Sequence, residues 1–199
     1  GESEKILGKL VNDAGREKII VSTKFTPQMA GMYGDSVVKM CEASLERMNM
    51  EYFDIYWIHN PIGAPEYTKQ LIPLLQSGKV KSVGVSNHNL AQIKEADEIL
   101  KAAGFRVSAV QNHYSLLNRS SEESGILDYC KANDIVFYGY MTLEQGALSG
   151  KYDAEHPFPE GSARAKVFNP MLQQIEVVTV ELKKVAEAHG ASAAQIATA

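Results

Sequence analysis

The chain has 199 residues, of which 45% are hydrophobic, and its 24 acidic and 20 basic side chains give a formal net charge of −4. That length and apolar content suffice to bury one substantial core. The acidic balance and the scattered Lys and Arg exclude the basic surface of a nucleic-acid-binding protein, and no apolar run approaches the length of a membrane span. We therefore predict a single globular domain in the cytoplasm.

Apolar segments with strand and helix patterns alternate along the chain. Helical spacing predicts helices over Glu2–Asp13, residues 37–48, Glu66–Gln76, Leu90–Ala103, residues 120–131, Met171–Ala188 and a last one from Ser192. Short runs rich in β-branched and aromatic residues predict strands over Ile19–Lys24, Tyr52–His59, Val80–Ser86, Val107–Asn112 and Ile135–Tyr140.

Boundary signals accompany several of these segments. Asn89 with Gln92, Ser120 with Glu123 and Ser192 with Gln195 have the spacing of a capping box, and Ser3, Asp35 and Asn169 are further candidate caps. Pro73 lies inside the segment Glu66–Gln76 and should kink that helix or confine it to a short piece, because proline lacks a backbone N–H.

The alternation recurs about every 30 residues, which is the length of a βαβ unit and indicates a parallel sheet covered by helices. An open doubly wound sheet and a closed (β/α)₈ barrel compete for this pattern. No Gly-x-Gly-x-x-Gly follows a predicted strand, whereas polar residues end nearly every strand, so we favour the barrel. A complete barrel needs about 250 residues and eight strands. Since only five strands are predicted, we expect strands to be missing at both ends.

The ends of the predicted strands present polar side chains. These are Lys24, His59 with Asn60, Ser86 with Asn87, Gln111 with Asn112, and Tyr140. Because the C-terminal ends of parallel strands form the face where ligands bind, an ammonium, an imidazole and several amides arriving there form a candidate active site. Such a set of groups can orient a carbonyl and a carboxamide.

Metal binding is not predicted. The other histidines, His88, His113, His156 and His189, show no i, i+4 pairing and no Cys/His ligand spacing. Cys41 and Cys130 lie far apart, without a Cys-x-x-Cys motif, which fits reduced thiols in a cytosolic protein.

Four segments together resemble the aldo-keto reductase family. Residues 20–24, Ile-Val-Ser-Thr-Lys, are similar to the strand that carries the family's catalytic lysine. Residues 45–59 resemble the family signature SLxRL…DYVDLYLIH, which ends in its catalytic histidine. Residues 78–87 resemble GKVKxIGVSN, and residues 146–152 resemble GxLSGKY. The likeness extends over essentially all 199 residues.

The resemblance implies NADPH-dependent reduction of aldehydes or ketones to alcohols on a (β/α)₈ barrel, with NAD as the second cofactor candidate. His59 would hydrogen-bond the substrate oxygen, and Lys24 would depress the pKa of a proton-donating tyrosine. Ser86, Asn87 and Gln111 would hold the nicotinamide carboxamide, and Tyr140 would stack on the ring. The remaining cofactor contacts implied by the match are the backbone of Met141, Leu143 and Gln145 along the pyrophosphate and the charge of Lys151.

The same resemblance implies that residues 1–199 are one barrel domain that lacks the N-terminal strands and the C-terminal strand with its cofactor loop. The family's tyrosine and its aspartate precede the part matched here, and Tyr33 matches no family position. Two alternatives remain, namely a catalytically incomplete cofactor-binding or regulatory module and a structural fragment that binds nothing. Two unpaired strand edges would also favour self-association through those edges. The substrate beyond a small carbonyl compound is not specified.

Overall fold

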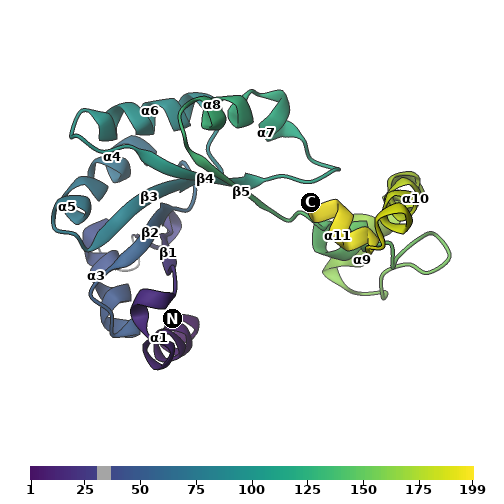
Figure 1. Ribbon diagram of the computed structural model, residues 1–199, viewed down its shortest axis with the longest axis horizontal. Coiled ribbons are helices and arrows are strands. Elements are labelled where there is room, and N and C mark those ends of the chain that lie inside the picture. Colours follow the sequence, from purple (N-terminus) through teal and green to yellow (C-terminus); the bar gives the residue numbers. More distant parts are fainter. Residues whose placement is uncertain (31–36) are drawn as a thin grey trace. The chain divides into compact units, whose positions relative to one another are not determined.

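The computed structural model describes residues 1–30 and 37–199, and the chain divides into two compact units (Figure 1). Unit 1 comprises Gly1–Asn112 and Ser121–Tyr138, and unit 2 comprises His113–Ser120 and Gly139–Ala199. Tyr33 and the predicted cap Asp35 lie outside the described residues. Within the described ranges, no helix is long and apolar enough to cross a membrane.

The strands of the predicted α/β sheet are all present, and all but the first begin and end within one residue of their predicted bounds. They are β1 Ser22–Phe25, β2 Phe53–Ile58, β3 Val80–Ser86, β4 Val107–His113 and β5 Val136–Tyr140, and they lie in this order across one sheet. The pairs β1–β2, β2–β3 and β3–β4 are parallel. Apart from α1, Glu2–Ala14, which precedes β1, the helices of unit 1 follow the strands, and helices cover one side of the sheet (Figure 1).

Two neighbouring rows of side chains run across this sheet on opposite faces, because successive residues of a strand point to opposite sides. One row joins Phe25, Ile58, Val85 and Val110 in register, and all four are buried in the core. The adjacent row joins Lys24, Trp57, Gly84 and Ala109. The side chains of the Lys24 row therefore point away from the hydrophobic core, which lies between the strands and the helices.

The helix α1, Glu2–Ala14, ends within one residue of its predicted end at Asp13, with Gly15 as its C-cap. Its N-cap is Gly1, so the prediction of Ser3 as the cap is wrong. The first strand is shorter than predicted. Residues Arg16–Lys18 form the 3₁₀ helix η1, and the N–H of Val21 donates to the side-chain carboxylate of Asp54 at 2.7 Å instead of to a backbone carbonyl of the neighbouring strand. Strand β1 consequently begins only at Ser22.

The remaining helices between β1 and β4 are α2 Pro27–Ala30, α3 Val37–Met48, α4 Ala64–Lys69, α5 Leu71–Gln76 and α6 Leu90–Lys101. The predicted helix Glu66–Gln76 is thus two short helices. Pro73 lies in the first turn of α5, where a backbone N–H needs no helical partner. The capping box of Asn89 and Gln92 at the start of α6 is confirmed.

The segment after β4 departs from its prediction. It forms α7, Ser120–Glu123, and α8, Ile126–Ala132, which are separated at Gly125 with a φ of 78°. Ser120 is the first residue of α7, and its hydroxyl donates to Asn118 Oδ1 at 2.7 Å. The predicted capping box of Ser120 with Glu123 is therefore wrong.

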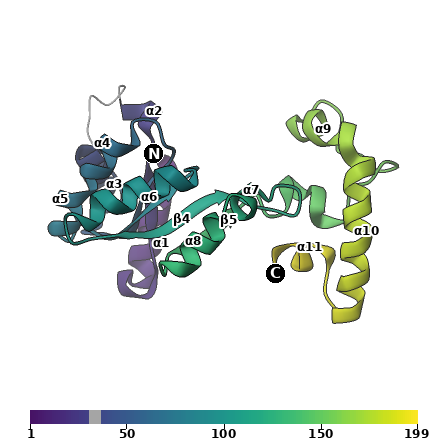
Figure 2. The ribbon, with the colours of Figure 1, turned by 90° about the horizontal axis from the view of Figure 1, so that it is seen from above.

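Unit 2 is mostly helical after β5. Its elements are η2 Glu144–Ser149, α9 Ala163–Phe168, η3 Asn169–Met171, α10 Leu172–His189 and α11 Ala193–Thr198. Figure 2 shows α11 folded back beside α10. Helix α9, capped by Ser162, was not predicted, and Asn169 begins a 3₁₀ turn instead of capping α10. The capping box of Ser192 and Gln195 is confirmed.

Replacing Asn89 with alanine should lower the free energy of unfolding by about 1 kcal/mol, because the Asn89 side chain accepts the Gln92 N–H at the start of α6. Urea unfolding followed by circular dichroism measures the change. Asn89→Asp keeps a side-chain acceptor and should remain close to the wild type. An alanine variant as stable as the wild type would show that this cap does not support α6.

Candidate active site

Lys24 and His59 lie on the same face of the sheet. Lys24 pairs in register with Trp57, and its ammonium lies 5.4 Å from the centre of the Trp57 ring. His59 follows two residues after Trp57, and its N–H donates to the Phe25 carbonyl at 2.9 Å, which holds the residue in the register of the sheet. The Thr26 hydroxyl lies 3.1 Å from His59 Nδ1. The amine and the imidazole therefore end neighbouring strands side by side, as the sequence predicts.

Burial lowers the pKa of the Lys24 ammonium. The pKa of His59 is also lowered, mainly by burial and to a smaller extent by the positive charge of Lys24. Both causes acting on His59 favour its neutral imidazole. Lys24 and Thr26 also line a cavity of about 430 Å³. A neutral imidazole beside a cation can donate a hydrogen bond to a ligand oxygen that gains negative charge.

The His59 environment predicts a pH dependence of stability. A base whose pKa is lowered on folding binds more protons when unfolded, so stability falls as the pH drops below the unfolded value of 6.5. We expect urea unfolding to show a smaller loss between pH 7.5 and pH 5.5 for His59→Gln than for the wild type. An NMR titration midpoint of His59 at or above 6.5 would contradict this expectation.

Asn87 connects the predicted carboxamide-binding residues to His59. Its side-chain amide donates to the His59 carbonyl at 2.9 Å and to Ser86 Oγ at 3.2 Å, and its backbone N–H donates to the Gln111 carbonyl at 3.1 Å. Asn87 has a φ of 60°, a left-handed conformation that Asn tolerates better than most residues. Ser86 and Gln111 are paired in register on β3 and β4. The structure thus brings Ser86, Asn87 and Gln111 together with His59.

The side-chain amide of Gln111 has no hydrogen-bond partner among the described residues, although Gln111 is half-buried. A half-buried amide with unused donor and acceptor capacity matches a ligand that also has both, such as a carboxamide. The residues of unit 1 therefore fit the nicotinamide end of a dinucleotide.

The other predicted cofactor residues belong to unit 2. Tyr140 ends β5 and stacks on His113, with the ring centres 5.4 Å apart. The Met141 carbonyl accepts the Glu144 N–H at 2.8 Å, and the Leu143 carbonyl accepts the Gly146 N–H at 2.9 Å. These two hydrogen bonds fold the segment into consecutive tight turns.

Gln145 and Lys151 lie on the surface of unit 2. The Gln145 carbonyl accepts a long hydrogen bond of 3.4 Å from Arg164, and Lys151 is exposed, with its ammonium 5.5 Å from the centre of the Tyr152 ring. The structure thus brings Tyr140, Met141, Leu143 and Gln145 together in one loop, with Lys151 shortly after it.

Two residues beside Lys24 and His59 were not recognised as part of the site from the sequence. Thr26 contacts the His59 ring, and Trp57 lies under the Lys24 ammonium. Thr26 could have been found by strand alternation, since it lies two residues after Lys24. The contact of Trp57 with Lys24 depends on the register between β1 and β2, which the sequence of one strand does not specify.

Comparison with known proteins identifies related chains. The model of the aldo/keto reductase family matches residues 1–199. Pyridoxal reductase from the chloroplast of Arabidopsis thaliana is 28% identical over 99% of this chain and 56% of its own length. An NADP(+) aldo-keto reductase of Schizosaccharomyces pombe is 30% identical over 100% of this chain and 62% of its own length. The chain thus spans less than two thirds of the length of these relatives.

Solved structures agree on the fold. The glycerol dehydrogenase of Gluconobacter oxydans superposes with a TM-score of 0.82 and 26% identity, over 98% of this chain and 63% of that one. An aldo/keto reductase of Klebsiella pneumoniae solved with NADP and acetate gives a TM-score of 0.69 at 22% identity, over 97% of this chain and 59% of that one. The predicted fold, a (β/α)₈ barrel represented here by five parallel strands, is confirmed.

Proposed function

The chain belongs to the aldo/keto reductase family, and from this membership we propose that its protein reduces aldehydes or ketones to alcohols with NADPH as the hydride donor. The observation that carries the proposal is that Lys24 and His59 lie on the same face of the sheet, at the ends of neighbouring strands. Beside them lies the amide cluster, which consists of the Asn87 and Gln111 amides with the Ser86 hydroxyl. The family membership and this geometry support the same chemistry independently.

His59 is proposed to bind the substrate carbonyl. We propose that the Thr26 hydroxyl, 3.1 Å from Nδ1, donates to that nitrogen, so that the proton of the neutral imidazole is on Nε2 and can be donated to the carbonyl oxygen. That hydrogen bond strengthens as negative charge develops on the oxygen during reduction. The lowered pKa of His59 supports this role, because it keeps the ring neutral.

Lys24 is proposed to act through its charge. A cation close to a phenol favours the phenolate and lowers the pKa of that phenol toward the working pH, which suits a tyrosine that donates a proton to the product alkoxide. The half-buried position of the Lys24 ammonium over Trp57 supports this role, because partial exclusion of water strengthens its field.

The dinucleotide supplies the hydride when it is bound. Ser86, Asn87 and Gln111 are proposed to hold the carboxamide and so fix which face of the nicotinamide meets the substrate. Tyr140 is proposed to stack on the ring, and Met141, Leu143, Gln145 and Lys151 to contact the pyrophosphate. The NADP(+) named for the Schizosaccharomyces pombe relative supports NADPH as the first candidate, with NADH as the second.

The test is made on the natural full-length polypeptide that contains these 199 residues. NADPH and NADH binding is measured by quenching of cofactor fluorescence, and turnover is measured by cofactor oxidation with a panel of small aldehydes and ketones. Binding together with turnover supports the reductase. Binding without turnover of any carbonyl would favour the regulatory module, and absence of binding to both cofactors would refute the proposal.

A further inference from the structure

Glu144 has an unusual environment in unit 2. Glu144 is only 5% exposed, and its carboxylate Oε1 accepts hydrogen bonds from His113 Nε2 at 2.6 Å and from the Ser115 hydroxyl. A buried carboxylate is unfavourable unless donors satisfy it, so these two contacts decide where the Glu144 side chain can lie. Neither His113 nor Glu144 has a role in the function proposed above.

The direction of each hydrogen bond to Glu144 is fixed by a second set of contacts. His113 Nδ1 accepts from the Asn118 amide at 2.9 Å, while Asn118 Oδ1 accepts from the backbone N–H of Ser120 at 3.3 Å; because a backbone N–H can only donate, the Asn118 amide cannot be reversed. The His113 ring therefore carries its proton on Nε2 and donates it to Glu144. Ser115 Oγ already accepts the N–H groups of Leu117 and Asn118, and its own proton goes to Glu144.

The loop that contains Glu144 adopts a strained backbone. Met141, Glu144 and Gln145 have φ values of 61°, 47° and 53°, in the left-handed region that residues with a Cβ seldom adopt. Such conformations persist only where surrounding contacts hold them, and they gather at functional sites. The buried Glu144 side chain anchors this loop, because it is hydrogen-bonded to His113 at the end of β4 and to Ser115 just after it.

His113 also supports Tyr140 directly. The two rings are nearly parallel, with an interplanar angle of 20°, and the Tyr140 carbonyl accepts the Tyr114 N–H at 3.2 Å. One residue, His113, thus contacts both ends of the segment 140–144, by ring stacking at Tyr140 and by a hydrogen bond at Glu144.

We propose that His113 and Glu144 are positioning residues that hold the segment 140–146 in the shape that binds the dinucleotide. This inference rests on the proposed function, in which Tyr140, Met141, Leu143 and Gln145 contact that ligand. We call the His113–Glu144 hydrogen bond, together with the stacking of His113 on Tyr140, the clasp. When the clasp is removed, the strained backbone relaxes, and only a fraction of the molecules keeps the segment in the conformation that binds the dinucleotide. The apparent dissociation constant then rises by the inverse of that fraction.

The test compares matched variants of the full-length protein. His113→Phe keeps an aromatic ring against Tyr140 but removes the donor to Glu144, and it should weaken NADPH binding about tenfold in a fluorescence titration. Glu144→Ala should give a similar loss and serves if His113→Phe does not fold. Glu144→Gln retains an oxygen that accepts both hydrogen bonds and should bind within about twofold of the wild type.

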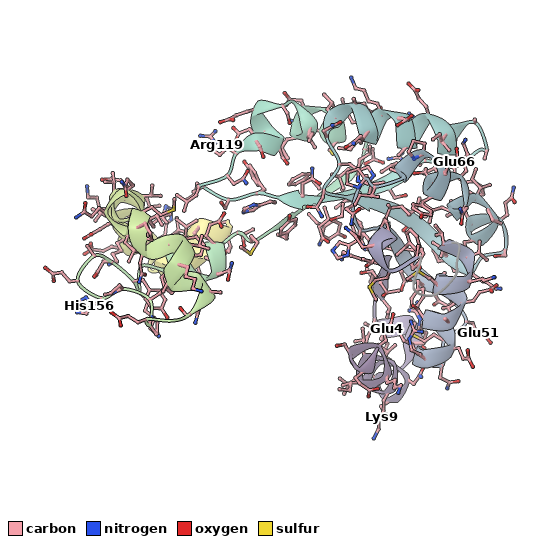
Figure 3. The ribbon with its side chains drawn as sticks, turned by 180° about the vertical axis from the view of Figure 1, so that it is seen from behind. Glu4, Lys9, Glu51, Glu66, Arg119 and His156 are labelled. Carbon is pink, nitrogen blue, oxygen red and sulfur yellow. The ribbon has the colours of Figure 1, made fainter. Side chains whose placement is uncertain are left out.

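His156→Phe is the control for the substitution itself, because His156 lies on an exposed loop of the same unit (Figure 3). It should bind NADPH like the wild type. Limited chymotrypsin digestion without cofactor gives a second readout, with faster cleavage after Tyr140 or Leu143 expected in His113→Phe than in the wild type and in Glu144→Gln.

Equal NADPH affinity and equal cleavage in His113→Phe and the wild type would overturn the positioning role. A Glu144→Gln variant as weak as Glu144→Ala would also overturn it, since the charge and not the hydrogen-bond geometry would then matter. A wild type that binds neither NADPH nor NADH would instead refute the proposed function. In that case the digestion alone decides whether the clasp holds the loop.

Discussion

Changing His59 to alanine is expected to lower kcat/KM for carbonyl reduction by about 10²- to 10⁴-fold, the range for loss of a positioned acid–base group. The affinity for NADPH should change little, because the Asn87 amide bonds the backbone carbonyl of His59, which alanine retains. Loss of the imidazole removes the donor to the substrate oxygen and leaves the amide cluster intact. Steady-state kinetics with a reactive aldehyde and a separate NADPH titration measure the two quantities.

The matched control is His156→Ala, which removes an exposed imidazole and should leave kcat/KM unchanged. A His59→Ala enzyme within about threefold of the wild type would contradict the proposed role, because such an effect is far smaller than that of a lost acid–base group. Equal losses of turnover and NADPH affinity would indicate that His59 supports the fold of the site instead.

Gly84→Val is expected to lower the free energy of unfolding by about 1–3 kcal/mol, the usual effect of overpacking a core. A Cβ at Gly84 would lie 2.3 Å from Cε3 of Trp57, whose ring is buried and packs edge-on against Tyr138 at 5.6 Å between ring centres. The indole would have to move, and the Lys24 ammonium rests over that indole. Urea unfolding should therefore show lost stability, and carbonyl reduction should fall as well.

A double-mutant cycle tests the cause of that loss. Trp57→Leu makes room for a side chain at position 84, so Gly84→Val should be less destabilising in the Trp57→Leu background than in the wild type. Gly139→Ala is the control, because its added Cβ would meet its nearest neighbour, Thr142 Cγ2, at an ordinary 3.4 Å. Additive effects at positions 57 and 84 would contradict the steric explanation.

The sequence predicts the elements of this fold better than their ends. The β3 strand ends at Ser86 as expected, because a run of alternating apolar residues stops at a polar pair. Ser3 and Ser120 were wrongly predicted as caps, because each lies inside the helix that it was expected to cap. At Ser120 the spacing Ser-x-x-Glu is therefore found within the helix itself. At Ser120 the decisive partner is Asn118, a contact that the capping pattern does not include.

The strand ends also predict which side chains gather at Lys24 and His59, since parallel strands bring their C-terminal ends to one edge of a sheet. The clasp at Glu144 could not be predicted, because a left-handed backbone at a glutamate is decided by tertiary contacts. The single-domain organisation, the cytoplasmic location and self-association through open strand edges remain predictions.

Trp57 is the sole tryptophan of the 199 residues, and it is 2% exposed. Its emission therefore reports on the Lys24 and His59 region without an added dye. Unfolding should shift that emission to longer wavelength, and a reduced nicotinamide held near β2 and β3 would accept its excitation energy. The same indole that makes Gly84 necessary thus provides an intrinsic optical signal for folding and for ligand occupancy.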